Sequence, residues 1–113
     1  MTRAPKAPDH LRPATAEWWL LVNRDYELEA HHVRLLTLAA EAYDRASQAR
    51  EMLAVDGITI ATADGGLKAH PAIAIERDSR LAFARLLREL DLDVEPPKGD
   101  KRPPALRSNR RTD

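Results

Sequence analysis

Few residues in this chain of 113 amino acids have the types and spacing that chemistry requires. The most prominent are the neighbours His31 and His32, because imidazoles commonly bind metals. Consecutive side chains on a helix point about 100° apart, so this pair does not readily hold one ion, and no HExxH spacing accompanies it. The chain also has no cysteine. We therefore interpret the pair as partly exposed histidines at a helix start, and we expect neither a metal site nor a cofactor.

Hydrolytic and phosphate-binding chemistry has equally little support. The serines Ser47, Ser79 and Ser108 lack the glycine-framed turn that exposes a nucleophile. The acids within 91–95 lie at the end of a predicted helix, and we interpret them as a solvated exit or a docking patch. The segment ADGGL (63–67) lacks the Gly-Lys-Ser/Thr of a phosphate loop and predicts a hairpin turn instead. We expect no catalytic residue.

The apolar pattern predicts a mainly α-helical protein with one small β-hairpin, an α+β fold class. Helices are expected over about 14–24, 29–55 and 71–90, the second about 40 Å long and rich in alanine. Pro13 suits a first helical turn, and Thr15 is a candidate N-cap. The expected buried face of the last helix consists of Ile75, Ser79, Ala82, Phe83, Leu86, Leu87 and Leu90.

The segment GITIATADGGLKAH (57–70) predicts the hairpin, because β-branched residues precede an Asp-Gly-Gly turn. A lone hairpin is barely stable in water. We therefore expect it to pack on the helices or to pair with another subunit.

Charge is segregated along the chain although its formal sum is +0. Residues 1–13 carry a net charge of +2 and residues 96–113 a net charge of +4, which leaves −6 on 14–95. Both end segments are rich in proline and charge, so we predict a disordered N-terminal arm (1–13), a helical core domain (14–95) and a disordered basic tail (96–113). Uncompensated cations attract nucleic-acid phosphates. The candidate DNA-binding residues are Arg3, Lys6, Arg12, Lys98, Lys101, Arg102, Arg107, Arg110 and Arg111.

Self-association is expected because a chain of this size, with much alanine and 4% aromatic residues, buries a limited core. Trp18 and Trp19 cannot share one helix face, so we expect one in the core and the other at an edge or interface. The alternative is that both cover the same small core from different angles. The candidate interface residues are Trp18, Trp19, Ile58, Ile60, Arg77 and Arg80.

No apolar run is long enough to cross a bilayer, and residues 1–13 lack the apolar stretch of a signal peptide. We expect a protein without membrane contact, in the cytoplasm of the cell that makes it.

The order of these features resembles the phage terminase small subunit family of actinobacterial tailed phages and prophages. The resemblance covers about residues 10–111. It is carried by HLRPATAEWW, DYELEAHHVRLLTLAAEAYDRASQARE, GITI with DGGLKAHPAIAIERDSRLAFARLLRELDLD, and PPALRSNRR. It implies a non-enzymatic subunit that forms a ring, binds double-stranded viral DNA and regulates the large terminase subunit, which carries the ATPase and nuclease. The resemblance also implies the cytoplasm of a bacterial host cell.

Two other functions stay open from the residues alone. A small helical DNA-binding regulator, such as a repressor or an antitoxin-like dimer, also has short helices and basic arms, although the helix at 29–55 is long for a recognition helix. An adaptor without a DNA role would use the acids at 91–95 and the tail to dock a protein.

Overall fold

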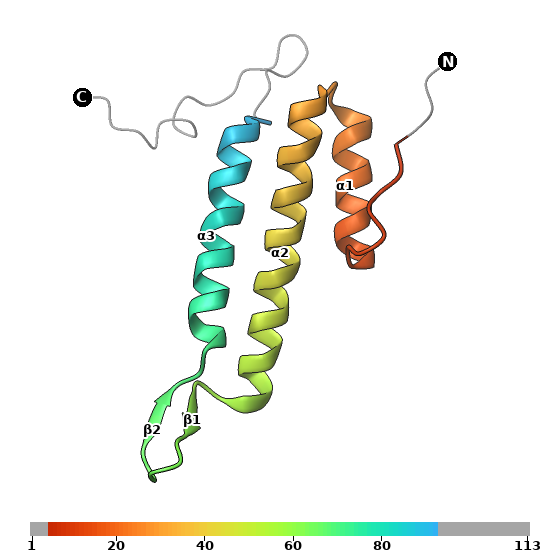
Figure 1. The fold of residues 1–113 in the computed structure, drawn as a ribbon. Coiled ribbons are helices and arrows are strands. Elements are labelled where there is room, and N and C mark those ends of the chain that lie inside the picture. The colour runs from red at the N-terminus through yellow and green to blue at the C-terminus, as the bar shows by residue number, and fades with distance from the viewer. Residues whose placement is uncertain (1–4, 93–113) are drawn as a thin grey trace, which may run out of the picture.

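The computed structural model of the chain describes residues 5–92, and it consists of three helices and one β-hairpin (Figure 1). The elements in chain order are α1 (Pro13–Asp25), α2 (Ala30–Asp56), β1 (Thr59–Ala61), β2 (Leu67–Ala69) and α3 (Ala72–Leu90). The strands pair antiparallel, with Ile60 opposite Lys68. The structure confirms the predicted fold class, a mainly α-helical chain with a small hairpin between its second and third helices.

The predicted start signal of α1 is half right. Pro13 occupies the first helical turn as expected, but Thr15 does not cap the helix. Thr15 lies within the helical segment and is buried, and its hydroxyl donates a hydrogen bond to Asp44 Oδ1 of α2 at 2.6 Å. The hydroxyl thus ties two helices together instead of satisfying a helix terminus.

Side chains and glycine define the ends of α2. Glu29 is the N-cap and forms a reciprocal capping pair with His32, whose Nδ1 accepts the Glu29 backbone N–H at 3.2 Å. Gly57 ends the helix with φ of 85°, and its N–H donates to the Leu53 carbonyl at 2.8 Å. A left-handed φ strains residues that carry a Cβ, so glycine is the expected stop residue here.

The base of the hairpin is held by His70, which is buried. Its Nδ1 accepts the N–H of Ala72, the first residue of α3, at 2.9 Å, and its Nε2 lies 2.9 Å from Asp56 Oδ2 at the end of α2. One imidazole therefore joins the end of α2 to the start of α3. At the other end of α3, Asp91 stops the helix in the left-handed conformation, with φ of 52°.

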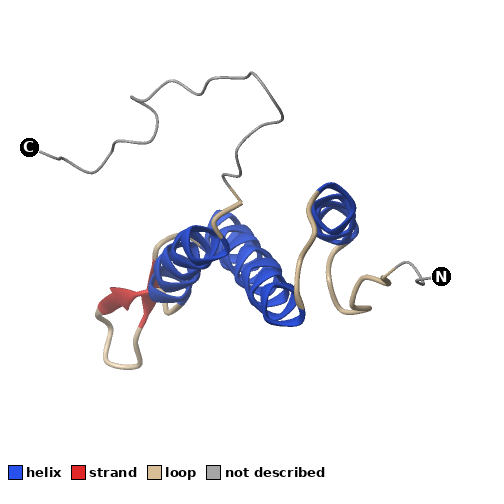
Figure 2. Ribbon diagram, turned by 90° about the horizontal axis from the view of Figure 1, so that it is seen from above, coloured by secondary structure: helices blue, strands red, loops and turns tan. Residues whose placement is uncertain are grey.

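The three helices form one bent layer with α2 in the centre (Figures 1 and 2). The chain direction of α2 is opposite to that of α1 and α3, and α3 accompanies α2 along most of its length. Trp18 of α1, Tyr43 of α2 and Phe83 of α3 lie close together, with ring centroids 6.0 Å apart for Trp18 and Phe83 and 5.3 Å apart for Tyr43 and Phe83. These three rings connect all three helices.

The core is small and centres on Leu36 of α2, which is fully buried. Around it lie Leu11, Trp19, Val22, Ala40 and Leu90. Buried alanines, including Ala39, Ala46 and Ala49, line α2 beyond this cluster. Because alanine has a short side chain, these positions allow α2 and its neighbours to pack closely within one chain.

Two features of α3 and of the hairpin differ from expectation. Ile75 and Ala82 were expected on the buried face of α3, but both are exposed, because α2 covers α3 from one side only. The hairpin extends beyond the helices (Figure 1), and Ile58 and Leu67 remain 64% and 71% exposed. The hairpin therefore packs little on the helices of its own chain, which was one of the two expected ways to stabilise it.

Residues 5–12 also differ from the disordered arm expected over 1–13. This segment precedes α1 in the sequence and packs on the helices, with Leu11 buried in the core cluster. His10 Nε2 lies 2.8 Å from Glu41 Oε2, and the backbone N–H of Arg12 donates to Asp44 Oδ2 at 2.9 Å. One buried leucine and these polar contacts order a segment whose composition alone predicts disorder.

Replacing Leu36 with alanine is expected to lower the free energy of unfolding by about 2–5 kcal/mol, because the substitution leaves a cavity at the centre of the small core. The same substitution at Leu81, which is 54% exposed on α3, is the matched control and is expected to change it by about 0.5 kcal/mol or less. Urea unfolding followed by circular dichroism at fixed protein concentration measures both. Equal losses for the two variants would contradict the assignment of Leu36 to the core.

Candidate nucleic-acid and oligomer interfaces

The predicted DNA-binding residues fall mostly at the two ends of the chain. Arg3 and the six cations of the tail, Lys98, Lys101, Arg102, Arg107, Arg110 and Arg111, lie outside the described residues. Lys6 is exposed and has no ion-pair partner within residues 5–92. Arg12 is the other cation of the N-terminal segment that the structure places.

The Arg12 side chain forms an ion pair with another residue of the same chain. Its guanidinium donates two hydrogen bonds to the Glu51 carboxylate of α2, at 2.8 and 3.1 Å. This bidentate contact raises the pKa of Arg12 and lowers the pKa of Glu51. Because Glu51 compensates its charge, Arg12 attracts a phosphate less strongly than Lys6 does, and its visible role is to fasten the N-terminal segment to α2.

The two tryptophans differ in burial, but both belong to the core: Trp18 is half-buried and packs against the cluster that contains Trp19. Trp19 is buried, and its Nε1 donates a hydrogen bond to Thr37 Oγ1 of α2 at 3.1 Å. Its side chain is therefore not available as an interface residue. Trp18 is half-buried and lines an open pocket of about 260 Å³ with Tyr43 and Phe83.

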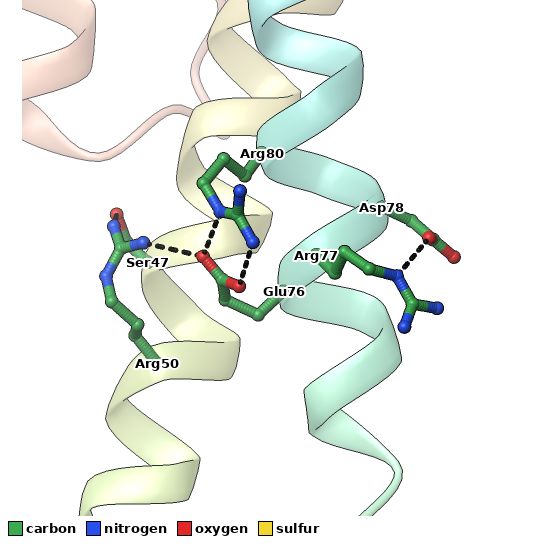
Figure 3. A network of polar contacts seen from close by, with 6 residues as sticks. All are labelled: Ser47, Arg50, Glu76, Arg77, Asp78 and Arg80. Atoms are coloured by element: carbon green, nitrogen blue, oxygen red, sulfur yellow. Dashed lines mark hydrogen bonds and ion pairs between the residues drawn. The ribbon is translucent and has the colours of Figure 1, made fainter.

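The arginines of α3 belong to a polar network centred on Glu76 (Figure 3). The Glu76 side chain is only 15% exposed. It accepts hydrogen bonds from Arg80 at 3.1 and 3.3 Å and from Arg50 of α2 at 3.1 Å. Arg77 lies beside this network, and its one side-chain polar contact within residues 5–92 is with its neighbour Asp78, at 3.3 Å. Glu76 therefore connects α3 to α2 through Arg50, and Arg80 supports Glu76 from within α3, whereas Arg77 remains at the surface.

Electrostatics make the Glu76 network sensitive to acid. The hydrogen bond from Arg80 is the largest effect and lowers the pKa of the Glu76 carboxyl. Burial opposes it, and the charges of Arg80 and Arg50 add further lowering, so the pKa lies below its ordinary value. A carboxyl whose pKa is lowered in the folded state stabilises that state above its unfolded pKa. The stabilisation is lost as the pH falls through the folded value.

The predicted hairpin interface is only partly accessible. Ile58 is exposed and Ile60 is half-buried. The tight turn contains a hydrogen bond from the Thr62 hydroxyl to Asp64, and the Gly66 N–H donates to Asp64 Oδ1 at 3.1 Å. The hairpin thus has a defined turn and an apolar surface that nothing in residues 5–92 covers fully.

Within the described residues, no group of three histidines, aspartates or glutamates could hold a metal ion. The rings of His31 and His32 lie with their centroids 4.0 Å apart and their planes tilted by 39°, and Nδ1 of His32 accepts a hydrogen bond in the cap of α2. Both ring nitrogens of His70 are also engaged, one by Asp56 and one by Ala72, so this ring has no nitrogen left to accept a proton from a nucleophile. Each of these histidine contacts has a structural explanation.

Sequence patterns missed one surface, the exposed groove between α2 and α3. Leu38, Ala42, Ala82 and Leu86 line it, and Glu41, Arg45 and Asp78 lie at its margin. Ala82 and Leu86 belong to the face of the last helix that was expected to be buried, so the sequence did not distinguish them from core.

Fold and surface together define a class of small helical proteins in which a long central helix and a hairpin link two shorter helices, with basic segments at the chain ends. The chain belongs to the phage terminase small subunit family, because the family model described as "Phage terminase, small subunit" matches residues 14–96, from α1 past the end of α3. Comparisons with curated proteins and with solved structures found no match. Among the described residues, no helix is long and apolar enough to span a membrane.

Glu76→Gln is expected to reduce the acid sensitivity of folding. The wild type should lose stability as the pH falls below about 4.5, the ordinary pKa of glutamate, because the unfolded state then binds the proton more readily. The variant should lose less between pH 7 and pH 3.5 in urea midpoints, since residue 76 no longer titrates. Glu89→Gln, a change of the same type at an exposed site on α3, is the control and should keep the wild-type pH dependence.

Proposed function

We propose that this chain is the DNA-recognition subunit of a phage DNA-packaging motor. It acts as a homo-oligomeric ring without catalytic activity of its own, binds double-stranded viral DNA in the host cytoplasm and regulates the large terminase subunit. The observation that carries the proposal is the family match over 14–96, which includes all three helices and the hairpin. In this arrangement the ATPase and nuclease activities belong to the large subunit.

The distribution of charge supports the role in DNA binding. The segment 14–95 carries a net charge of −6, whereas 96–113 carries +4. An acidic body repels phosphates, so contact with DNA is concentrated in the end segments. In an oligomer each copy adds its own basic segments, and the combined binding is far stronger than that of one weak segment.

The exposed apolar surface supports the oligomeric state. Ile58 and Leu67 of the hairpin, Leu38 of α2 and Leu20 and Leu21 of α1 are all substantially exposed. A two-stranded hairpin is marginally stable alone. Further copies of the chain would cover this surface, and we include Ile58, Ile60, Trp18 and Arg77 among the residues that contact them.

Deleting residues 96–113 is expected to weaken DNA binding and to flatten its dependence on salt, because phosphate contacts release counterions in proportion to their number. Fluorescence anisotropy with duplex DNA at two salt concentrations measures both. The control is a full-length variant in which the six tail cations are replaced by glutamine, which tests charge without shortening the chain. Unchanged affinity and salt slope in both variants would remove the tail from the DNA-binding surface and leave Lys6 and Arg3 as candidates.

Native mass spectrometry of the purified full-length protein is expected to show an assembly of more than two copies. When copies meet head to tail, a closed ring pairs every contact surface, whereas a two-fold dimer needs a surface that pairs with itself. A stable dimer at all concentrations would contradict the motor subunit and favour a dimeric DNA-binding regulator.

A further inference from the structure

Two apolar surfaces on this chain have no cover within residues 5–92. The first is the outer face of α1, where Leu20 and Leu21 are 41% and 43% exposed. Together with Ala14, Trp18 and Pro5 they line an open depression of about 820 Å³ that also contains Glu17 and Arg24. A helix face of this composition is suited to packing against another apolar surface rather than to facing water.

The second surface is the groove between α2 and α3, with a volume of about 350 Å³. Leu38, which is 51% exposed, and Leu86 form its apolar lining together with the small residues Ala42 and Ala82. Small residues between larger ones allow another helix to approach closely, with its side chains between the ridges of the groove. The groove therefore has the shape and chemistry to accept a helix.

The two surfaces face different directions, so they cannot meet within one chain. Trp19 of α1 contacts Thr37 of α2, which defines the direction in which these helices face one another. Leu21 follows Trp19 by two residues and so points about 200° away from it, to the outside of α1. Leu38 follows Thr37 by one residue and is turned about 100° from the α1 side of α2. Each surface is thus open to another molecule.

We propose that the outer face of α1 in one copy packs into the α2–α3 groove of a second copy, in a head-to-tail contact. This inference rests on the proposed homo-oligomer and assigns the surfaces that build it. The charges are compatible: Glu17 on the α1 face and Arg45 at the groove margin have opposite signs, and neither has an ion-pair partner among residues 5–92.

A second copy suits these surfaces better than the other available occupants. The segment 93–113 contains only Val94, Ala105 and Leu106 besides its prolines as apolar residues, too few to cover both surfaces. DNA does not suit the groove, because its lining is apolar and Glu41 and Asp78 repel phosphates. Each copy carries both surfaces, so a head-to-tail contact leaves one of each unfilled until a ring closes.

The test uses two full-length variants that each block one surface. Leu21→Arg places a charge on the α1 face, and Leu38→Arg places one in the groove. Both side chains are substantially exposed in the chain, so the long arginine reaches water without disturbing the fold, which circular dichroism verifies. Leu81→Arg, at an exposed leucine on α3 outside the groove, is the matched control.

Each blocked variant alone is expected to be monomeric by native mass spectrometry, whereas Leu81→Arg should assemble like the wild type. An equimolar mixture of the two blocked variants should form a 1:1 heterodimer and stop there. Leu21→Arg still has an intact groove, and Leu38→Arg still has an intact α1 face, so one productive contact remains between them.

Three results would overturn the inference. Assembly of both blocked variants at the wild-type size would show that other surfaces build the oligomer, while the proposed function stands. Blocked variants that each form a homodimer, and form no heterodimer on mixing, would indicate symmetric contacts in which each surface meets its own copy. A wild type that is monomeric at every concentration would refute both the head-to-tail contact and the proposed ring.

Discussion

The packing of both other helices against α2 is the interaction on which the rest of the structure depends. A single layer of three helices gives the central helix two covered sides and each outer helix one. Leu36 and the buried alanines of α2 occupy the covered sides. Trp18, Tyr43 and Phe83 form ring contacts that join all three helices. Because a one-layer domain cannot bury the opposite faces of its outer helices, apolar surface on α1 and at the α2–α3 groove follows directly from this architecture.

Polar contacts in this protein fasten elements whose apolar contacts are few. Asp44 holds the N-terminal segment and α1 to α2, Glu76 holds α3 to α2 through Arg50, and His70 closes the base of the hairpin. Each uses charge or a buried hydrogen bond where a larger domain would use a thicker core. Aspartate, glutamate and histidine are residue types that also act in catalysis, but these three side chains hold the helices and the hairpin together.

The division of charge and the shortage of core have related consequences for function. The charge is negative over 14–95 and positive over both end segments, and our proposal assigns assembly to the acidic body and phosphate binding to the basic segments. Exposed leucines on the body are available for protein contacts, because DNA does not compete for apolar surface with neighbouring acids. In the proposed packaging subunit, this separation would let the same chain form an assembly and hold DNA without one contact excluding the other.

The sequence by itself predicted the three helices and the hairpin, because helix periodicity and turn residues act locally. The family was indicated separately, by the resemblance of whole segments, and the family match over 14–96 supports it. The sequence also indicated that at least one tryptophan belongs to the core. Only the tertiary structure decided that Trp19 is the more buried of the two, that Thr15 binds Asp44 rather than capping α1, and that Arg12 is paired with Glu51. It likewise decided that Ile75 and Leu38 are exposed. These outcomes depend on which neighbour covers each helix face, and periodicity marks an apolar face without saying whether the same chain or another copy covers it.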